Sequence, residues 1–124
     1  METNLLNDTT WNELVDVMEL STVEKSINLY FNELDTLLNA LNELELSHDV
    51  QNIERQVHSA KGSSLTFGAE KLGHSLQKLE LLFKEILAGQ SPDLLGANIL
   101  IQITKISPLI IQTRDAISKK LNKI

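Results

Sequence analysis

Apolar residues recur at steps of three and four positions along most of this chain, and this spacing limits the fold more than any other feature. One continuous run of this kind extends from Ile27 to Leu44. An α-helix brings residues three and four apart onto the same face, so the spacing predicts helices that each bury one side. No segment alternates apolar and polar residues in steps of two, which predicts that there is no β-sheet. We therefore predict an all-α protein.

Residues that start helices place the first two. Thr10–Glu13 and Ser21–Glu24 each fit a capping box, in which the side chains of the first and fourth residues satisfy free amide groups at a helix start. The first helix is predicted to be short and to end near Leu20. The second is predicted to extend from Ser21 to about Leu46.

Glycines and the apolar stripes place the third and fourth helices. The third is predicted to start at Ser47 or Asp49 and to break at Gly68, and Gly89 closes the fourth. The residues expected to face the core are Val50, Ile53, Val57, Ala60, Ser64 and Phe67 on the third helix, and Leu72, Leu76, Leu79, Phe83 and Ile86 on the fourth.

The last helix is predicted to begin at Ser91–Asp93, where a serine precedes a proline at the first helical position. It should extend to Leu121. Pro108 lies inside this helix and is expected to kink it, or to split it with Ser107 as a new cap, because proline lacks the amide donor and crowds the preceding turn.

Four long amphipathic helices with short connections predict an antiparallel up-and-down four-helix bundle, with the short first helix covering one end. A chain of 124 residues has room for one core, so we expect a single domain over residues 1–124. We also expect a monomer, since the pattern indicates no second apolar face.

Composition and charge exclude several classes of function. The absence of cysteine excludes a disulfide scaffold, a thiolate metal site and a cysteine nucleophile, and it is typical of a cytoplasmic protein. The net charge of −6 argues against nucleic-acid binding, which needs a basic surface. The most apolar stretch, Leu94–Ile111, is interrupted by polar residues and a proline, so we expect no direct membrane contact.

The third helix contains an outward-facing histidine in an unusual setting. At roughly 100° per residue, His58 points about 130° away from the centre of the buried stripe. Helical side chains lean toward the N-terminus, so Lys61 can reach back toward a group on the His58 ring. Gly62 leaves the ring uncovered where any larger side chain would crowd it. A glycine inside a helix costs about 1 kcal/mol relative to alanine, which points to a role other than stability.

This arrangement suits phosphoryl transfer. The neutral imidazole of His58 can attack a phosphoryl group in line, and the ammonium of Lys61 can neutralise the charge on the phosphoryl oxygens. Histidine suits the role of a carrier because an imidazole is substantially neutral near physiological pH.

The segment His58-x-x-Lys61-Gly62-x-Ser64-x-x-x-Gly68-Ala69 resembles the signature of histidine phosphotransfer (HPt) domains. The specific part of the resemblance extends from His58 to about Lys84. The resemblance implies that His58 is the phosphoacceptor through Nε2, that Lys61 stabilises the phosphoryl group and that Gly62 gives access to the ring. It also implies that Ser64 packs inward and that Gly68 ends the helix.

Two residues of the fourth helix correspond to further family positions. Glu80 stands where some members have glutamine, and the resemblance implies that it accepts a hydrogen bond from Nδ1–H of His58 and orients the imidazole. Lys84 stands at a position that is often basic and is expected to contact the phosphoryl group or the partner. The residues expected to dock the partner are Ser59, Ser63 and Leu65 near His58, and Val17 on the first helix.

The family resemblance also implies partners and context. Such domains relay phosphoryl groups between the aspartates of response-regulator receiver domains in two-component systems. They contain no ATP site and no metal, and the receiver supplies Mg²⁺. Many form the C-terminal module of a hybrid sensor kinase, which can be tethered to the inner membrane. The basic end of the last helix, Lys119–Lys123, favours such a module here.

Other interpretations stay open beside this one. A metal site formed by His58, His74 and Glu80 is disfavoured because no Glu-x-x-His pair occurs on any helix. His48 and His74 are expected to be ordinary solvated residues. Glu80 and Lys84 could likewise be solvated edge residues, and Leu65 an incidental surface leucine. The alternative function is a helical docking or adaptor domain without chemistry.

Overall fold

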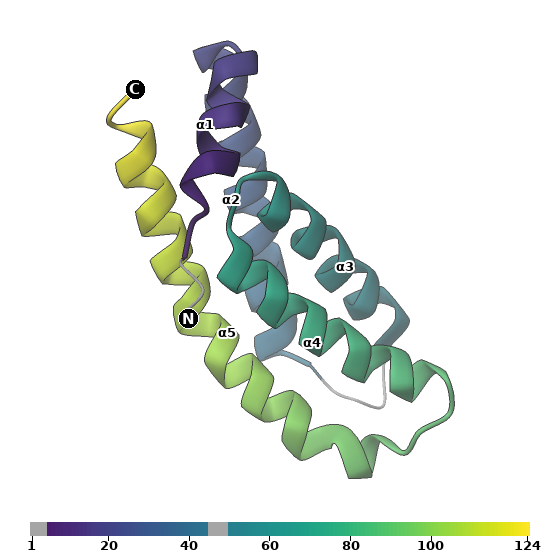
Figure 1. Ribbon diagram of the computed structural model, residues 1–124. Coiled ribbons are helices and arrows are strands. Elements are labelled where there is room, and N and C mark those ends of the chain that lie inside the picture. Colours follow the sequence, from purple (N-terminus) through teal and green to yellow (C-terminus); the bar gives the residue numbers. More distant parts are fainter. Residues whose placement is uncertain (1–4, 45–49) are drawn as a thin grey trace.

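Five α-helices follow one another in the computed structural model, which describes residues 5–44 and 50–124 apart from the side chains at 92–94 (Figure 1). No strand occurs in these ranges, so the prediction of an all-helical fold is confirmed. The helices are α1 (Asp8–Val17), α2 (Leu20–Asn42), α3 (Val50–Thr66), α4 (Glu70–Leu87) and α5 (Pro92–Leu121).

Four of the helices pack in a closed ring around one core. Helix α2 contacts α3, α3 contacts α4, α4 contacts α5, and α5 contacts α2. The apolar stripes predicted from the sequence meet inside this ring, and of the residues expected on α3 and α4 only Ile86 is partly exposed. Fully buried residues at the centre include Leu34, Leu37, Val57, Leu76, Leu79, Phe83, Ile106 and Ile110.

Helix α1 begins three residues earlier than the sequence predicted, at Asp8. The side chain of Asn7 accepts a hydrogen bond from the Thr10 amide at 3.0 Å and is the N-cap, so the capping box at Thr10–Glu13 is wrong. Asparagine is at least as good an N-cap as threonine. Asn7 is also held by tertiary contacts. Its backbone amide donates to the Gly68 carbonyl at 2.7 Å, and its side-chain amide donates to Glu70.

Both predicted ends of α2 also differ from the structure. The helix begins at Leu20, and the Glu19 carbonyl accepts its first hydrogen bonds, so Ser21 lies inside the helix and does not cap it. The helix ends at Asn42 rather than near Leu46. Leu44 still packs on the core after the helix has ended, which explains why the apolar spacing predicted a longer helix. The predicted start of α3, Ser47 or Asp49, lies outside the described residues.

Gly68 sets the turn that folds α4 back against α3. The Gly68 amide donates to the Leu65 carbonyl and the Ala69 amide donates to the Ser64 carbonyl, which is the Schellman pattern of helix ends. Gly68 has a φ of +79°, and a Cβ there would lie 2.9 Å from the Asn7 carbonyl oxygen. Both observations require glycine, and the prediction that Gly68 ends the helix is confirmed.

Helix α5 begins at Pro92 as predicted and continues through Pro108 to Leu121 (Figure 1). The hydroxyl of Ser107 donates to the Ile103 carbonyl inside the same helix, so the alternative of a split with Ser107 as a new cap is wrong. A kink at Pro108 stays a prediction.

The outer face of α5 is more apolar than we expected. Ile99, Ile106 and Ile110 are buried in the core, but Leu100, Ile101 and Ile111 are exposed. Residues Leu95–Leu121 are long and apolar enough to cross a membrane by length and composition, with a mean hydropathy of 1.2 over 18 residues. A core helix passes the same test. The expectation of a monomer rested on the absence of a second apolar face. The exposed apolar side of α5 removes that basis.

Candidate functional site

His58 lies on the outer side of α3, as the helical spacing predicted. Its side chain is 62% exposed, whereas Val57 and Ala60 beside it are fully buried. Within the part of the chain that the structure describes, no group hydrogen-bonds to Nε2 of the imidazole. One ring nitrogen is therefore open to an incoming molecule.

The other ring nitrogen is held by a carboxylate of the neighbouring helix. Nδ1 of His58 lies 2.6 Å from Oε2 of Glu80, whose side chain is only 2% exposed. Glu80 lies on α4, the helix that packs directly against α3. The interpretation of Glu80 as a solvated edge residue is wrong because the side chain is buried.

Lys61 binds the same carboxylate. Its Nζ donates to Oε1 of Glu80 at 2.7 Å, one turn along α3 from His58. The two oxygens of Glu80 are thus shared between the imidazole of His58 and the ammonium of Lys61. The sequence predicted a lysine leaning toward the histidine, and the structure places it beside the ring through this shared partner.

The charge of Glu80 is stabilised by these contacts. Burial alone would raise the pKa of Glu80, but hydrogen bonds from Lys61 and His58, with the attraction of Lys61 and Lys84, lower the pKa below its ordinary value. The carboxylate is therefore ionised at neutral pH and can only accept hydrogen bonds. It follows that Nδ1 of His58 carries the proton, and that a neutral His58 ring has its lone pair on Nε2.

Lys84 lies at the edge of the same group of charges. Its Nζ is 3.9 Å from Oε2 of Glu80 and 4.0 Å from Oε1 of Glu54, and its side chain is 53% exposed. Both distances exceed that of a hydrogen bond, so the ammonium is held only by charge. Sequence reasoning missed Glu54, although its place four residues before His58 puts it on the same side of α3.

Gly62 is exposed one turn after His58, and a Cβ added there would meet nothing within 4 Å. The expectation that any larger side chain would crowd the ring was therefore too broad. A methyl group has room, and only a longer side chain can reach the imidazole.

The predicted docking residues differ in their surroundings. Leu65 is exposed and packs on Gly73 of α4. A Cβ added to Gly73 would lie 2.7 Å from Cδ2 of Leu65. Ser59 donates to Oε2 of Glu33 on α2 at 2.6 Å, and Ser63 is partly buried on the same side of α3. Val17 is 82% exposed at the end of α1, and no hydrogen bond or ion pair of the described residues joins it to the His58 group.

Behind the histidine, α3 is fixed to α2 by a buried polar pair. Ser64 is fully buried, as predicted, and its hydroxyl lies 2.6 Å from the hydroxyl of Tyr30. The Tyr30 ring stacks on Phe67, and burial raises the pKa of the Tyr30 hydroxyl above its ordinary value. This pair holds the side of α3 away from His58, and no local pattern in the sequence indicated that these two residues would meet.

The remaining histidines are His74 and His48. His74 is exposed on α4, and His48 lies outside the described residues. Among the residues that the structure describes, no group of three or more histidine or acidic side chains is arranged to hold a metal ion.

Comparison with known proteins gives one finding. The family model of the Hpt domain matches residues 25–116, which is well over half of the 124 residues and includes the whole His58 group. Neither the curated proteins nor the solved structures gave a significant match. Since the match spans α3 and α4 together with most of α2 and α5, the chain belongs to the Hpt domain family, which implies a part in phosphorelay signalling.

Proposed function

We propose that this protein accepts a phosphoryl group from a receiver aspartate onto Nε2 of His58 and passes it to the aspartate of another receiver. The observation that carries this proposal is the pairing of His58 with Glu80. One ring nitrogen is exposed, and the other is held at 2.6 Å by a buried carboxylate. This pairing leaves the lone pair of the neutral ring at the exposed nitrogen, where a nucleophile is needed.

The transfer step balances with the groups present. The lone pair of Nε2 forms the new N–P bond, and the bond between phosphorus and the aspartyl oxygen of the receiver breaks. The aspartate leaves as a carboxylate. The proton on Nδ1 stays in place, so positive charge develops on the ring, and the ionised Glu80 beside Nδ1 stabilises it. The reverse transfer uses the same groups.

The lysines would act on the phosphoryl oxygens. Lys84 is exposed and held only by charge, so its ammonium can turn toward a phosphoryl group on His58. Lys61 is bound to Glu80, and we propose that it shares its donors between this carboxylate and the phosphoryl oxygens. Gly62 keeps the approach to the ring open, and Leu65, Ser59, Ser63 and Val17 are proposed to contact the receiver.

The wider context is part of the proposal. The partners are response-regulator receiver domains, which supply Mg²⁺ and the acidic pocket, and this domain needs no cofactor of its own. We place it in the cytoplasm, as the C-terminal module of a hybrid sensor kinase. The ring of α2–α5 is proposed to be an antiparallel up-and-down bundle with a kink at Pro108, as short connections between neighbouring helices favour.

Transfer from isolated receivers tests this function. Receivers phosphorylated with ³²P-labelled acetyl phosphate are incubated with the wild type, with His58→Gln and with His74→Gln as the matched control. We expect acid-labile, base-stable label on the wild type and on His74→Gln, and none on His58→Gln. A folded wild type that exchanges label with no receiver would instead indicate a docking domain without chemistry.

A further inference from the structure

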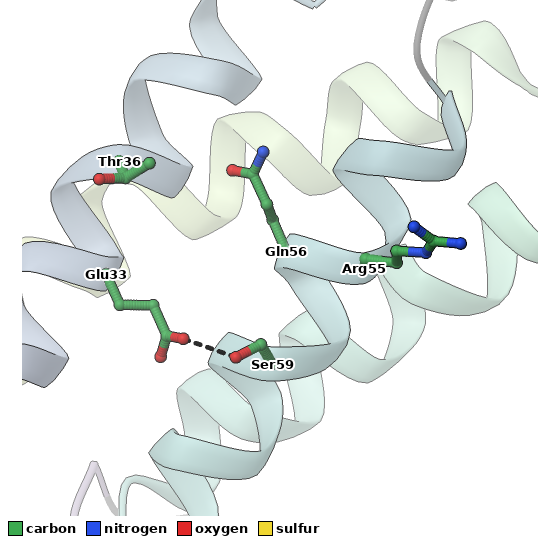
Figure 2. A pocket seen from close by; sticks show the side chains of 5 residues that line it. All are labelled: Glu33, Thr36, Arg55, Gln56 and Ser59. Carbon is green, nitrogen blue, oxygen red and sulfur yellow. Dashed lines mark hydrogen bonds between the residues drawn. The ribbon is translucent and has the colours of Figure 1, made fainter.

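A pocket of about 300 Å³ lies between α2 and α3, beside the histidine. The residues that line it are Glu33, Thr36, Arg55, Gln56 and Ser59 (Figure 2). A second hollow of about 250 Å³ also includes Glu33 and extends along α3 to Ser63 and Phe67. Ser59 lines the first pocket and directly follows His58 in the chain. A protein that covers His58 on α3 therefore also lies next to this pocket.

Among the described residues, no donor reaches one acceptor oxygen on each of two side chains that line the pocket. One oxygen of the Glu33 carboxylate, Oε2, accepts from the Ser59 hydroxyl at 2.6 Å. The other, Oε1, is shielded from solvent without a hydrogen-bond partner, and so is Oε1 of Gln56. Shielded acceptors without a donor are uncommon in native proteins. A donor that enters the pocket from another molecule would satisfy them.

The carboxylate of Glu33 indicates what this donor is. Among the described residues Glu33 forms no ion pair. Figure 2 shows the carboxylate of Glu33 turned toward Ser59, and the guanidinium of Arg55 pointing away from both. A carboxylate and an amide carbonyl attract cationic donors and repel anions. The ammonium of lysine and the guanidinium of arginine carry several donors and no acceptor, and both match this pair.

We propose that the pocket receives a lysine or arginine side chain of the docked receiver domain, and that Glu33 thereby helps to select the partner. This inference rests on the proposed function, because it takes a receiver as the molecule that covers His58. Ser59 occupies only Oε2 of Glu33, which leaves Oε1 for the incoming cation. The net charge of −6 favours a partner with a basic surface.

The test compares two glutamates of the same helix. Glu33→Gln removes the charge but keeps an acceptor for Ser59. Glu24→Gln is the matched control because Glu24 is exposed on α2 and, nine residues away at about 100° per residue, points to the opposite side of the helix. The probe is the purified receiver of the source genome that exchanges phosphoryl fastest with the wild type.

We expect Glu33→Gln to raise the KM for this receiver by about tenfold, more than it lowers the rate at saturation, and to weaken the salt dependence of KM. Glu24→Gln should leave KM near the wild-type value. Equal effects of the two variants would overturn the proposal, because only the net charge would then matter. Circular dichroism of both variants checks that the helices are intact.

A double-mutant cycle identifies the cation. Each basic residue on the receiver surface is changed to alanine and combined with Glu33→Gln, and binding is measured by titration of the receiver into the His58→Gln variant. We expect one lysine or arginine whose effect on affinity disappears when Glu33 is already changed. The proposal for the pocket would be overturned if the effects on affinity were additive for every basic residue, or if no receiver bound.

These readouts separate the two proposals. If no receiver transfers phosphoryl to the wild type, the proposed function fails, and the titrations still decide the pocket. If the wild type is phosphorylated and Glu33→Gln has the same KM, only the pocket fails.

Discussion

Glu80 of α4 holds Nδ1 of His58 at 2.6 Å while its own side chain is almost entirely buried. This contact joins an exposed imidazole to the interior of the bundle. The carboxylate is fixed by packing and by Lys61, so the ring it orients is fixed as well.

Removal of the carboxylate should change the tautomer of His58. In the wild type we expect the neutral ring to carry its proton on Nδ1, because ionised Glu80 can only accept. In Glu80→Ala this preference is lost, and transfer from a receiver should slow by about 10- to 100-fold, the range typical for loss of a carboxylate that orients a functional histidine. The ¹⁵N chemical shifts of the ring at high pH report the tautomer. An unchanged tautomer in Glu80→Ala would show that another group orients the ring.

Glu80 should also make stability depend on pH. The pKa of Glu80 is lowered in the folded protein, relative to about 4.3 in an unfolded chain. Its charged contacts therefore stabilise the fold fully above the unfolded pKa, and this stabilisation is lost as the pH falls through the lower folded pKa. Urea unfolding of the wild type and Glu80→Gln from pH 7 to pH 3 measures the effect. The difference between them should shrink in acid, and a difference that grows as the pH falls would contradict the sign of the shift.

Two substitutions of Gly62 should separate helix stability from access. Gly62→Ala should stabilise the protein by about 1 kcal/mol and leave transfer nearly unchanged, because a helix favours alanine and an added Cβ meets nothing within 4 Å. Gly62→Gln should keep the stability gain but slow transfer strongly. Thermal unfolding and transfer rates are measured on both. Normal transfer by Gly62→Gln would show that glycine is not needed for access to His58.

The buried hydroxyl pair of Tyr30 and Ser64 should contribute to the stability of α3. Ser64→Ala leaves the Tyr30 hydroxyl without its partner in the core and should cost about 1–3 kcal/mol in the free energy of unfolding. Tyr30→Phe should have a similar cost, and the double variant should cost less than the sum of the two. Urea unfolding of the cycle measures this. Strictly additive costs would mean that the 2.6 Å contact adds no energy of its own.

The sequence predicted the parts of the fold that depend on local spacing. Residues such as Val57, Leu76 and Phe83 are buried as their helical spacing indicated, and His58 faces outward for the same reason. Gly68 and Gly89 end their helices, with positive φ angles, because these terminations are local backbone patterns. The side a residue faces and the point where a helix ends depend on one or two helical turns, so both can be predicted from the sequence.

Contacts between helices could not be predicted from spacing. Asn7 replaces Thr10 as the N-cap of α1, and it is also anchored on Gly68, far along the chain. Glu33 meets Ser59 across α2 and α3, and sequence reasoning did not single it out. Glu80 was found only through the family resemblance, since a glutamate on α4 shows by itself no sign that it faces a histidine on α3.

The central claim is that Nε2 of His58 carries the phosphoryl group, and NMR spectroscopy of the phosphorylated protein with ¹⁵N-labelled histidine tests it most directly. The account predicts a ³¹P–¹⁵N coupling to one ring nitrogen only, Nε2 of His58, and its absence in His58→Gln. A phosphoryl group on Nδ1, or on any other residue, would contradict the account.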